Sequence, residues 1–365
     1  MIYLDHAATT PICEAAKKAI IEHLDDFGNP SSSHEIGHKA KMLIEEARDR
    51  IAYRINAEPD EIYFTSGGSE ADTWVLNEKC SLASSIEHHA ICPTFTFKAT
   101  SNGVADLEDI NRILLSNKVY SPIKIGVVSC MAVNNELGTV QPIDRIAKIT
   151  HDYGALFHTD AVQAIAHLPI DIKSLNCDML SASGHKFGAP KGTGFLYIKN
   201  SISISPLILG GKQEQGIRGG TENTLGIVAM AAALEDTVIN MEAREGHIRA
   251  LRDILLPCLL SIDGVYLNGD QTHRIYSNIN VRINGVSGQD VVAMCDQYGI
   301  CISAGSACNE GNAEPSHVLK AIGLTDEEAL SSIRITLGHQ NTFEEIEYVC
   351  DMLPKIIARL REINN

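Results

Sequence analysis

The residues best suited to chemistry lie in one short stretch, Ser183-Gly184-His185-Lys186, which follows an apolar segment that we expect to be a strand. A lysine amine that is desolvated, or that lies near other cations, can lose its proton near neutral pH and attack a carbonyl carbon. Small residues and a histidine beside it suit a lysine that holds an aldehyde cofactor as a Schiff base. We therefore predict that Lys186 binds pyridoxal phosphate, although a surface lysine after a buried strand is the plainer interpretation.

A carboxylate that can serve such a cofactor follows another predicted strand. Pyridoxal phosphate acts as an electron sink, and this requires a protonated pyridine nitrogen with a buried acid beside it. Asp160 follows the expected strand at 155–159, and Gln163 comes three residues later, within reach of the cofactor's phenolic oxygen. Asp160 also fits the N-cap of a following helix, and Gln163 also fits a solvated position. We predict that both contact the cofactor.

A phosphate site is predicted where a strand, a glycine turn and a helix follow one another. Residues 61–66 are expected to form a buried strand, which Gly67-Gly68-Ser69 joins to the start of a helix. The free N–H groups and the positive dipole end of such a start suit a phosphate. Because most turns of this composition bind nothing, the prediction that Gly68 and Ser69 hold phosphate depends on the residues around Lys186.

Three further polar side chains complete the predicted site. His88 is a candidate to stack on the cofactor ring and to move protons, although an isolated histidine is more often structural. Asn135 and Arg334 suit a substrate carboxylate, since the planar arginine fork matches two carboxylate oxygens. An ion pair is the plainer role for an arginine at the start of a strand. We predict no metal site.

The elements that must position these side chains alternate between strand and helix. This alternation predicts an α/β domain with a mostly parallel sheet that binds ligands at the carboxyl ends of its strands. Asn135, Asp160 and Lys186 all fall at such ends. The expected strands are 61–66, 123–133 and 155–159, and the expected helices run from Thr10-Pro11 to about Leu24, from the loop at 28–33 to about Asn56, and over 144–153.

The second half of the chain predicts a smaller α+β domain. Thr325 and Thr342 each begin a capping box. The expected elements are helices at 224–240 and 242–260, a strand at 278–283, a helix at 289–298, a strand at 300–303 and a last helix with its apolar face at Ile346, Val349, Leu353, Ile356, Ile357 and Leu360. Since 365 residues exceed the usual size of one core, we expect a large domain at 10–240 and a small one at 241–365 together with 1–9.

The composition is that of an ordinary globular protein with an acidic surface. The net charge of −16 disfavours direct binding to nucleic acid or to an anionic membrane, since both need a basic face. The first residues lack the features of a signal peptide, and the longest apolar run, Leu225 to Leu234, is too short to span a bilayer. Ten cysteines without a Cys-x-x-Cys pair fit reduced thiols. We expect a cytoplasmic protein in which every cysteine except Cys308 is a small buried hydrophobe.

These motifs resemble the cysteine desulfurases of the NifS and IscS type, within the class V group of fold-type-I pyridoxal phosphate enzymes. The resemblance runs nearly end to end. It rests on Tyr3-Leu4-Asp5-His6-Ala7-Ala8-Thr9-Thr10-Pro11, Phe27-Gly28-Asn29-Pro30-Ser31-Ser32, Phe64-Thr65-Ser66-Gly67, Glu87-His88, Val133-Asn134-Asn135-Glu136, Asp160-Ala161-Val162-Gln163, Ser183-Gly184-His185-Lys186, Arg218-Gly219-Gly220-Thr221, Ser303-Ala304-Gly305-Ser306-Ala307-Cys308 and Ser332-Ile333-Arg334.

The resemblance implies a role for each candidate residue. Lys186 would hold the cofactor, Asp160 would pair with its ring nitrogen and Gln163 would contact its phenolic oxygen, with His88 stacked on the ring. The residues implied to hold the phosphate are Gly68, Ser69, Ser183 and His185.

Two implied roles go beyond the cofactor pocket of one chain. Thr221 would reach the phosphate of the neighbouring subunit, which implies a homodimer with shared active sites. Asn135 and Arg334 would take the carboxylate of L-cysteine.

Cys308 decides the implied reaction. It ends a stretch of small residues and precedes Asn309-Glu310-Gly311-Asn312, a composition typical of a mobile loop. Lys186 would remove the substrate's α proton with help from His88, and the Cys308 thiolate would attack the substrate sulfur. The products would be alanine and a persulfide on Cys308, which an acceptor such as an iron–sulfur cluster scaffold protein would receive.

Three alternatives stay open: a selenocysteine lyase of the same fold, a class V aminotransferase that does not depend on Cys308, and a catalytically silent binding subunit. The chain also departs from housekeeping relatives. The segment between Leu76 and Glu87 is shorter, and His339-Gln340 stands where a basic residue is common. The destination of the sulfur therefore stays open as well.

Overall fold

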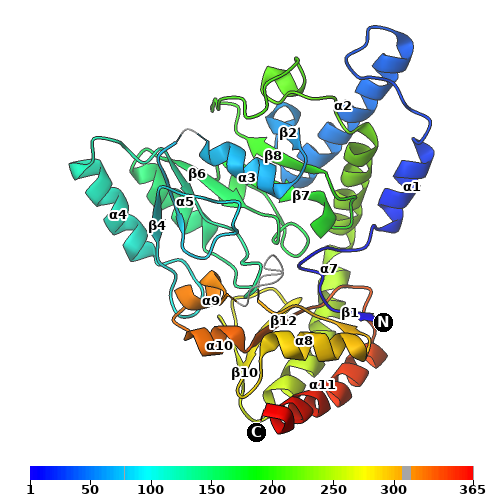
Figure 1. Cartoon of the computed structure of the whole chain (residues 1–365). Coiled ribbons are helices and arrows are strands. Elements are labelled where there is room, and N and C mark those ends of the chain that lie inside the picture. The colour runs from blue at the N-terminus through cyan, green and yellow to red at the C-terminus, as the bar shows by residue number, and fades with distance from the viewer. Residues whose placement is uncertain (78, 306–313, 365) are drawn as a thin grey trace.

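A seven-stranded sheet in the upper half of Figure 1 carries the candidate site. The computed structural model describes residues 1–77, 79–305 and 314–364. The strand order is β2-β8-β7-β6-β5-β3-β4, and only β8 runs antiparallel to its neighbours. This sheet confirms the predicted α/β fold. Its strands are β2 (Ile62–Thr65), β3 (Ser81–Ser84), β4 (Phe95–Phe97), β5 (Val127–Ser129), β6 (Leu156–Asp160), β7 (Met179–Ser183) and β8 (Gly194–Ile198).

Helices cover both faces of the sheet, so its strands are apolar on both sides, as is typical of parallel sheets. In β2, Phe64 packs into the larger core, whereas Tyr63 packs on the opposite face against Trp74, with ring centroids 6.3 Å apart. The helices of this part are α1 (Glu14–Glu22), α2 (Glu35–Ile55), α3 (Gly68–Leu76), α4 (Leu107–Tyr120), α5 (Ile143–Asp152) and α6 (Ile172–Leu175), with 3-10 turns η1 (Pro59–Glu61), η2 (Gly184–Lys186) and η3 (Glu214–Gly216).

The lower part in Figure 1 is built on a three-stranded antiparallel sheet, β12-β10-β9. The first strand of the chain, β1 (Ile2–Tyr3), also belongs here, because it pairs with β11 (Ile300–Cys301). Both capping boxes and the predicted apolar face of the last helix are confirmed. The remaining elements are β9 (Val265–Leu267), β10 (Asn278–Ile283), β12 (Ser332–Thr336), α8 (Gly288–Gln297), α9 (His317–Ala321), α10 (Asp326–Leu330) and α11 (Phe343–Asn364).

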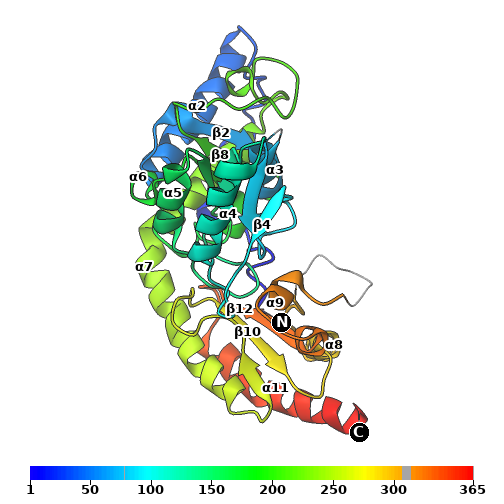
Figure 2. The same cartoon turned by 90° about the vertical axis from the view of Figure 1, so that its left-hand side faces the viewer.

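One long helix, α7 (Thr224–Leu260), joins the two parts, as Figure 2 shows. The prediction of two helices is wrong, because the helix continues unbroken through Met241 and Gly246. The predicted domain boundary at 240 therefore has no break in the helix to mark it, and it stays a prediction. By length and composition α7 is able to cross a membrane, but half of its apolar window is buried in the protein, where its side chains belong to both cores.

Two predictions about the N-terminal half need correction. Thr10 is not the N-cap of α1: the cap is Cys13, whose Sγ accepts from the N–H of Ala16, while the Thr10 hydroxyl donates to the carbonyl of His185 at 2.8 Å. The strand expected at 123–133 is limited to β5, since Ile123 is 66% exposed and lies before the sheet. Thr10 thus ties the N-terminal segment to the turn that carries Lys186.

The cysteines differ from the prediction in their burial. Each of the nine cysteines that the structure describes is free. Cys130, Cys177 and Cys295 are buried, as predicted, but Cys92 is exposed and the other five are half-buried. A cysteine pattern alone therefore did not reveal which thiols reach solvent.

Candidate active site

A cavity of about 330 Å³ opens at the carboxyl ends of the central strands. The residues that line it come from segments far apart in the sequence, between Gly68 and Arg334. This is expected at the strand ends of an α/β sheet. Ala7 and Ala8 of the N-terminal segment also line it. The predicted residues in its wall are Gly68, Ser69, His88, Asn135, Asp160, Gln163, Ser183, His185, Lys186 and Arg334.

Lys186 ends the 3-10 turn η2, directly after the buried strand β7. The turn is tight at Gly184, where a Cβ would lie 2.8 Å from the Thr193 hydroxyl and 2.9 Å from the Ala189 methyl group. Lys186 Nζ donates to the carbonyl of Ala8 at 2.9 Å and also to that of Ala7. The amine thus points across the cavity to the N-terminal segment.

The N-terminal segment forms one wall of the cavity through contacts with residues of the large sheet. Gln163 Nε2 donates to the carbonyl of Ala7 at 2.9 Å. The ring Nδ1 of His185 lies 3.1 Å from the Thr9 hydroxyl, and burial lowers the pKa of His185 to about 4, so its ring is neutral. The predicted cofactor residues Gln163 and His185 therefore also hold this wall.

Asp160 is the last residue of β6 and is 5% exposed. Its Oδ1 accepts from the N–H of Val162 at 2.8 Å, so the local turn holds the carboxyl group in place. Burial raises the pKa of Asp160 to about 6, against the opposing effects of that N–H and of Lys186. A positive charge beside Asp160 would stabilise its ionised form.

The start of α3 has the features of an anion site. Gly67 precedes the helix with a φ of 153°, and a Cβ on Gly68 would lie 2.7 Å from the Val162 side chain. The backbone N–H groups at this start are therefore reachable from the cavity that Ser69 and Ser183 line. This geometry suits the phosphate predicted there.

The His88 ring lies in the same cavity, with Nδ1 accepting from the N–H of Ala90 at 3.1 Å. Since Nδ1 accepts, the neutral ring carries its proton on Nε2. Burial lowers the pKa of His88, and Lys186 lowers it further, followed by His89 and His317. His88 is therefore neutral at physiological pH and able to take up a proton.

Arg334 and Asn135 present polar atoms without partners. Arg334 Nη1 donates to the carbonyl of Asn135 at 3.0 Å, and Nη2 donates to Asp5 at 2.9 Å. The Nε of Arg334 and the Oδ1 of Asn135 are buried and have no hydrogen-bond partner within the described part of the chain. Buried polar groups of this kind are costly unless a ligand or water satisfies them.

One predicted residue that the structure describes is not in this cavity. Thr221 is exposed and does not line it. Cys308 lies outside the described residues. The roles predicted for both stay predictions.

Sequence reasoning missed Asp72 and Met131 in the wall of the cavity, and it gave no role to the buried Glu87, which precedes His88. Asp72 lies on α3 four residues after Gly68, and hence on the same helix face. That spacing was the available signal, since an aspartate between the buried Ala71 and Trp74 has to face something polar.

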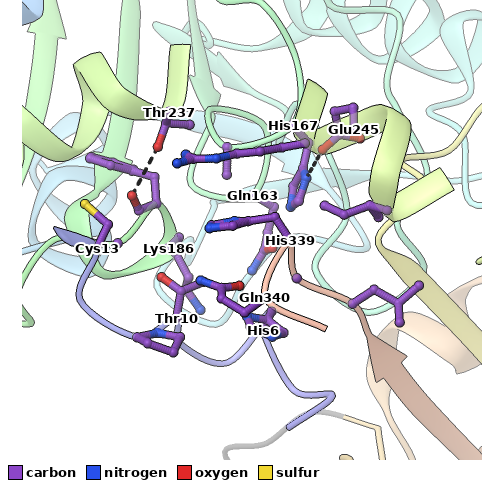
Figure 3. Close-up of a pocket in the computed structure, with 18 of the residues that line it drawn as sticks. His6, Thr10, Cys13, Gln163, His167, Lys186, Thr237, Glu245, His339 and Gln340 are labelled. Atoms are coloured by element: carbon purple, nitrogen blue, oxygen red, sulfur yellow. Dashed lines mark hydrogen bonds and ion pairs between the residues drawn. The ribbon is translucent and has the colours of Figure 1, made fainter. Parts of the chain in front are cut away.

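A second, smaller cavity of about 60 Å³ shares Lys186 and Gln163 with the first (Figure 3). His167 and His339 line it, and the Nδ1 of His167 lies 2.7 Å from Glu245. Burial lowers the pKa of His339 to about 4, and the positive charge of Arg244 acts in the same direction. The residue that replaces the common basic side chain is thus neutral and lies next to the site.

An amine at the end of a buried strand, with a buried acid and an anion site across one cavity, defines an enzyme that works through a lysine and a phosphate-bearing cofactor. Residues 2–349 match the aminotransferase class-V family, and the chain belongs to that family.

Two similar proteins in the comparisons are named as cysteine desulfurases. The cysteine desulfurase IscS of Methanosarcina thermophila is 40% identical over 379 residues, covering 100% of this chain and 93% of that protein. That of Dictyoglomus turgidum is 39% identical over 385 residues, covering 100% and 96%. Among solved structures, the NifS-like protein from Rickettsia africae has a TM-score of 0.91 and 34% identity, covering 98% and 99%. A structure of SspA in complex with cysteine has a TM-score of 0.79 and 32% identity, covering 94% and 100%.

Proposed function

We propose that this chain is a pyridoxal phosphate-dependent cysteine desulfurase, which converts L-cysteine to L-alanine. The meeting of Lys186 and Asp160 in one cavity, opposite Arg334, is the observation that carries the proposal. The full-length relatives named cysteine desulfurase support the reaction. The solved relative in complex with cysteine supports the substrate.

The residues present fit pyridoxal phosphate. Asp160 supplies a buried carboxylate that a pyridinium nitrogen would stabilise, and the start of α3 supplies N–H groups for a phosphate. Gln163 is the candidate partner of the phenolic oxygen, and Ser183 and His185 are candidates to bind phosphate. When bound, the cofactor supplies an electron sink next to the substrate's α carbon.

Lys186 and His88 are the groups that handle protons. Lys186 Nζ would hold the cofactor through its aldehyde carbon, and as a free amine it would be the base for the substrate's α proton. His88, neutral with its proton on Nε2, lies in the same cavity and assists proton transfer. Burial keeps the His88 ring uncharged, so the ring is able to take up a proton.

Arg334 and Asn135 bind the substrate carboxylate. The Nε of Arg334 is a buried donor without a described partner. The side-chain amide of Asn135 would donate through its NH₂ group, since its unpaired Oδ1 can only accept. A carboxylate between them would accept from an arginine whose orientation Asp5 already fixes.

The sulfur leaves through Cys308. Its thiolate attacks the substrate sulfur, the bond between carbon and sulfur breaks, and the electron pair remains on the carbon side until a proton completes alanine. The sulfur stays on Cys308 as a persulfide, and an acceptor thiol then takes it. Cys308 lies outside the described residues, so its motif supports this step.

The proposal includes a homodimer in which Thr221 reaches the partner's site, as the resemblance implies. Thr221 is exposed and lies outside the cavity of its own chain. It also includes an acceptor protein for the persulfide, such as an iron–sulfur cluster scaffold. A cytoplasmic location is supported by the free state of the described cysteines.

The test is to measure alanine and sulfide from L-cysteine with purified enzyme, pyridoxal phosphate and a thiol reductant. We expect equal amounts of both, and borohydride should fix the cofactor on Lys186, as a mass increase of that peptide shows. Lys186→Ala should lose both signals, whereas Lys191→Ala, at an exposed lysine in the next turn, should keep them.

Other products would contradict the proposal in recognisable ways. A keto acid in place of alanine would indicate an aminotransferase. Turnover of selenocysteine alone would indicate a selenocysteine lyase, and failure to bind the cofactor would indicate a silent subunit.

A further inference from the structure

Three carboxyl groups from separate segments converge at the base of the candidate cofactor site. Asp160 ends β6, Asp72 lies on α3 and Glu87 follows β3, and they are 5%, 1% and 4% exposed. Asp72 and Asp160 line the same cavity. Because a buried carboxylate is costly, and a neighbour of like charge adds to the cost, the three groups cannot all be ionised together.

The hydrogen bonds around these acids leave two oxygens without a partner. Glu87 Oε1 accepts from the N–H of Met131 at 2.9 Å, but its Oε2 has no partner, and neither has Asp72 Oδ1. Both oxygens are buried. An ionised carboxylate would leave such an oxygen with an unsatisfied charge, whereas a protonated one becomes a donor.

No described cation compensates Asp72. The nearest candidate is His158, whose Nε2 lies 3.8 Å from Asp72 Oδ1. The ring nitrogens of His158 lie 2.9 Å from the hydroxyls of Ser129 and Ser181, and burial lowers its pKa to about 3. His158 is therefore neutral and supplies no positive charge.

The three acids differ in how readily they ionise. Burial and the charge of Asp160 raise the pKa of Asp72 well above its usual range, although Ser181 acts in the opposite direction. Burial raises the pKa of Glu87 to about 8 and that of Asp160 to about 6. Lys186, which faces the same cavity, favours the ionised form of Asp160 alone among the three. Asp160 is thus the acid that carries the negative charge.

We propose that Asp72 is a neutral carboxylic acid that donates its proton to the Asp160 carboxylate, so that the partner of the cofactor nitrogen is a hydrogen-bonded acid pair. This inference rests on the proposed function. With Asp72 and Glu87 neutral, the base of the site holds one negative charge, which matches the one positive charge of a pyridinium ring. Asp72 is a positioning residue, because it acts by holding and orienting Asp160.

The first experiment measures the affinity of the apo enzyme for pyridoxal phosphate by absorbance titration. Asp72→Asn keeps a donor without a charge, so its dissociation constant should stay within about threefold of wild type, whereas Asp72→Val, which has no donor, should weaken binding about tenfold. Asp160→Asn should weaken it more than either. If Asp72→Asn weakens binding as much as Asp160→Asn, or if Asp72→Val changes nothing, the proposal is wrong.

The pH dependence of the bound cofactor's absorbance gives a second readout. Asp72→Val should shift the midpoint of this titration, because the Asp160 carboxylate loses its donor, and Asp72→Asn should restore the wild-type midpoint. A shift of equal size in both variants would overturn the proposal.

The third experiment does not depend on the cofactor. The infrared spectrum of the apo enzyme near neutral pH should contain the carbonyl band of a protonated carboxylic acid, which the Asp72→Asn variant lacks. Glu87→Gln removes the neighbouring neutral acid and serves to separate the two bands. An apo enzyme with no Asp72-dependent band would overturn the inference, whereas an enzyme that has the band but binds no cofactor would overturn only the proposed function.

Discussion

Arg334 on β12 donates through Nη2 to the carboxylate of Asp5 at 2.9 Å, so the last strand of the small sheet is joined to the N-terminal segment at the edge of the cavity. Its Nη1 donates to the carbonyl of Asn135, which follows β5. The guanidinium is therefore held from two sides before any substrate enters. A group oriented in advance loses less entropy on binding.

Arg334→Lys should raise the KM for L-cysteine about tenfold or more, because a lysine keeps the charge but loses the planar fork. Asp5→Asn should raise it by a smaller factor, since the arginine stays but loses its partner. Steady-state alanine formation measures both. Arg282→Lys on the neighbouring strand β10 is the matched control, and an unchanged KM for Arg334→Lys would remove Arg334 from substrate binding.

Glu87 predicts a pH-dependent stability. Its pKa of about 8 in the folded protein exceeds its usual 4.5, so the folded state binds a proton that the unfolded state has lost between these values. The contribution of this proton to the free energy of unfolding is fully present below pH 4.5. It is lost as pH rises toward 8, at up to about 1.4 kcal/mol per pH unit. As pH rises from 5 to 8, the melting temperature of the apo wild type should therefore fall relative to that of apo Glu87→Gln. A constant difference across this range would show that Glu87 ionises normally.

Cys308→Ala should abolish the persulfide and reduce alanine release to the background rate, while the cofactor absorbance stays unchanged. Mass spectrometry after one turnover should find the extra sulfur on Cys308. Cys92→Ala is the control, because Cys92 is the exposed thiol within the described ranges. A persulfide that forms on Cys92 instead would move the sulfur-carrying role to that residue.

Thr221→Ala should weaken cofactor binding about tenfold, the effect of one hydrogen bond to a charged group, while the dimer stays intact. Subunit mixing tests where the hydroxyl acts. A dimer of one Thr221→Ala chain and one Lys186→Ala chain contains one complete site if Thr221 reaches across the interface, and so should regain wild-type affinity in that site. If mixing does not restore cofactor affinity, Thr221 acts within its own subunit or has no role in the site.

The sequence predicted the residues of the site better than it predicted the boundaries of the helices and strands. Asp160 and Lys186 were found because each follows a buried strand, and neighbouring parallel strands end at the same edge. Thr325 and Thr342 were found because a capping box is a local interaction. Such features depend on a few adjacent residues.

What could not be predicted depends on contacts between distant segments. The Thr10 hydroxyl donates to His185 and not to its own helix, and nothing near Thr10 signals that partner. The charged stretch after Met241 suggested a new helix, yet α7 continues because it has two cores to pack against. The acid group around Asp72 likewise forms only when α3 meets β6 and β7.

The pairing of β1 with β11 also sets an order of events during synthesis. The first residues of the chain find their strand partner about three hundred residues later, and Asp5 finds Arg334 later still. Ala7 and Ala8, which line the lysine's cavity, lie four and five residues after the end of β1. The large sheet can fold as it leaves the ribosome, since domains fold as units during translation. The cavity wall is completed only when the last strand has emerged, so the nascent chain should acquire its cofactor at the end of translation.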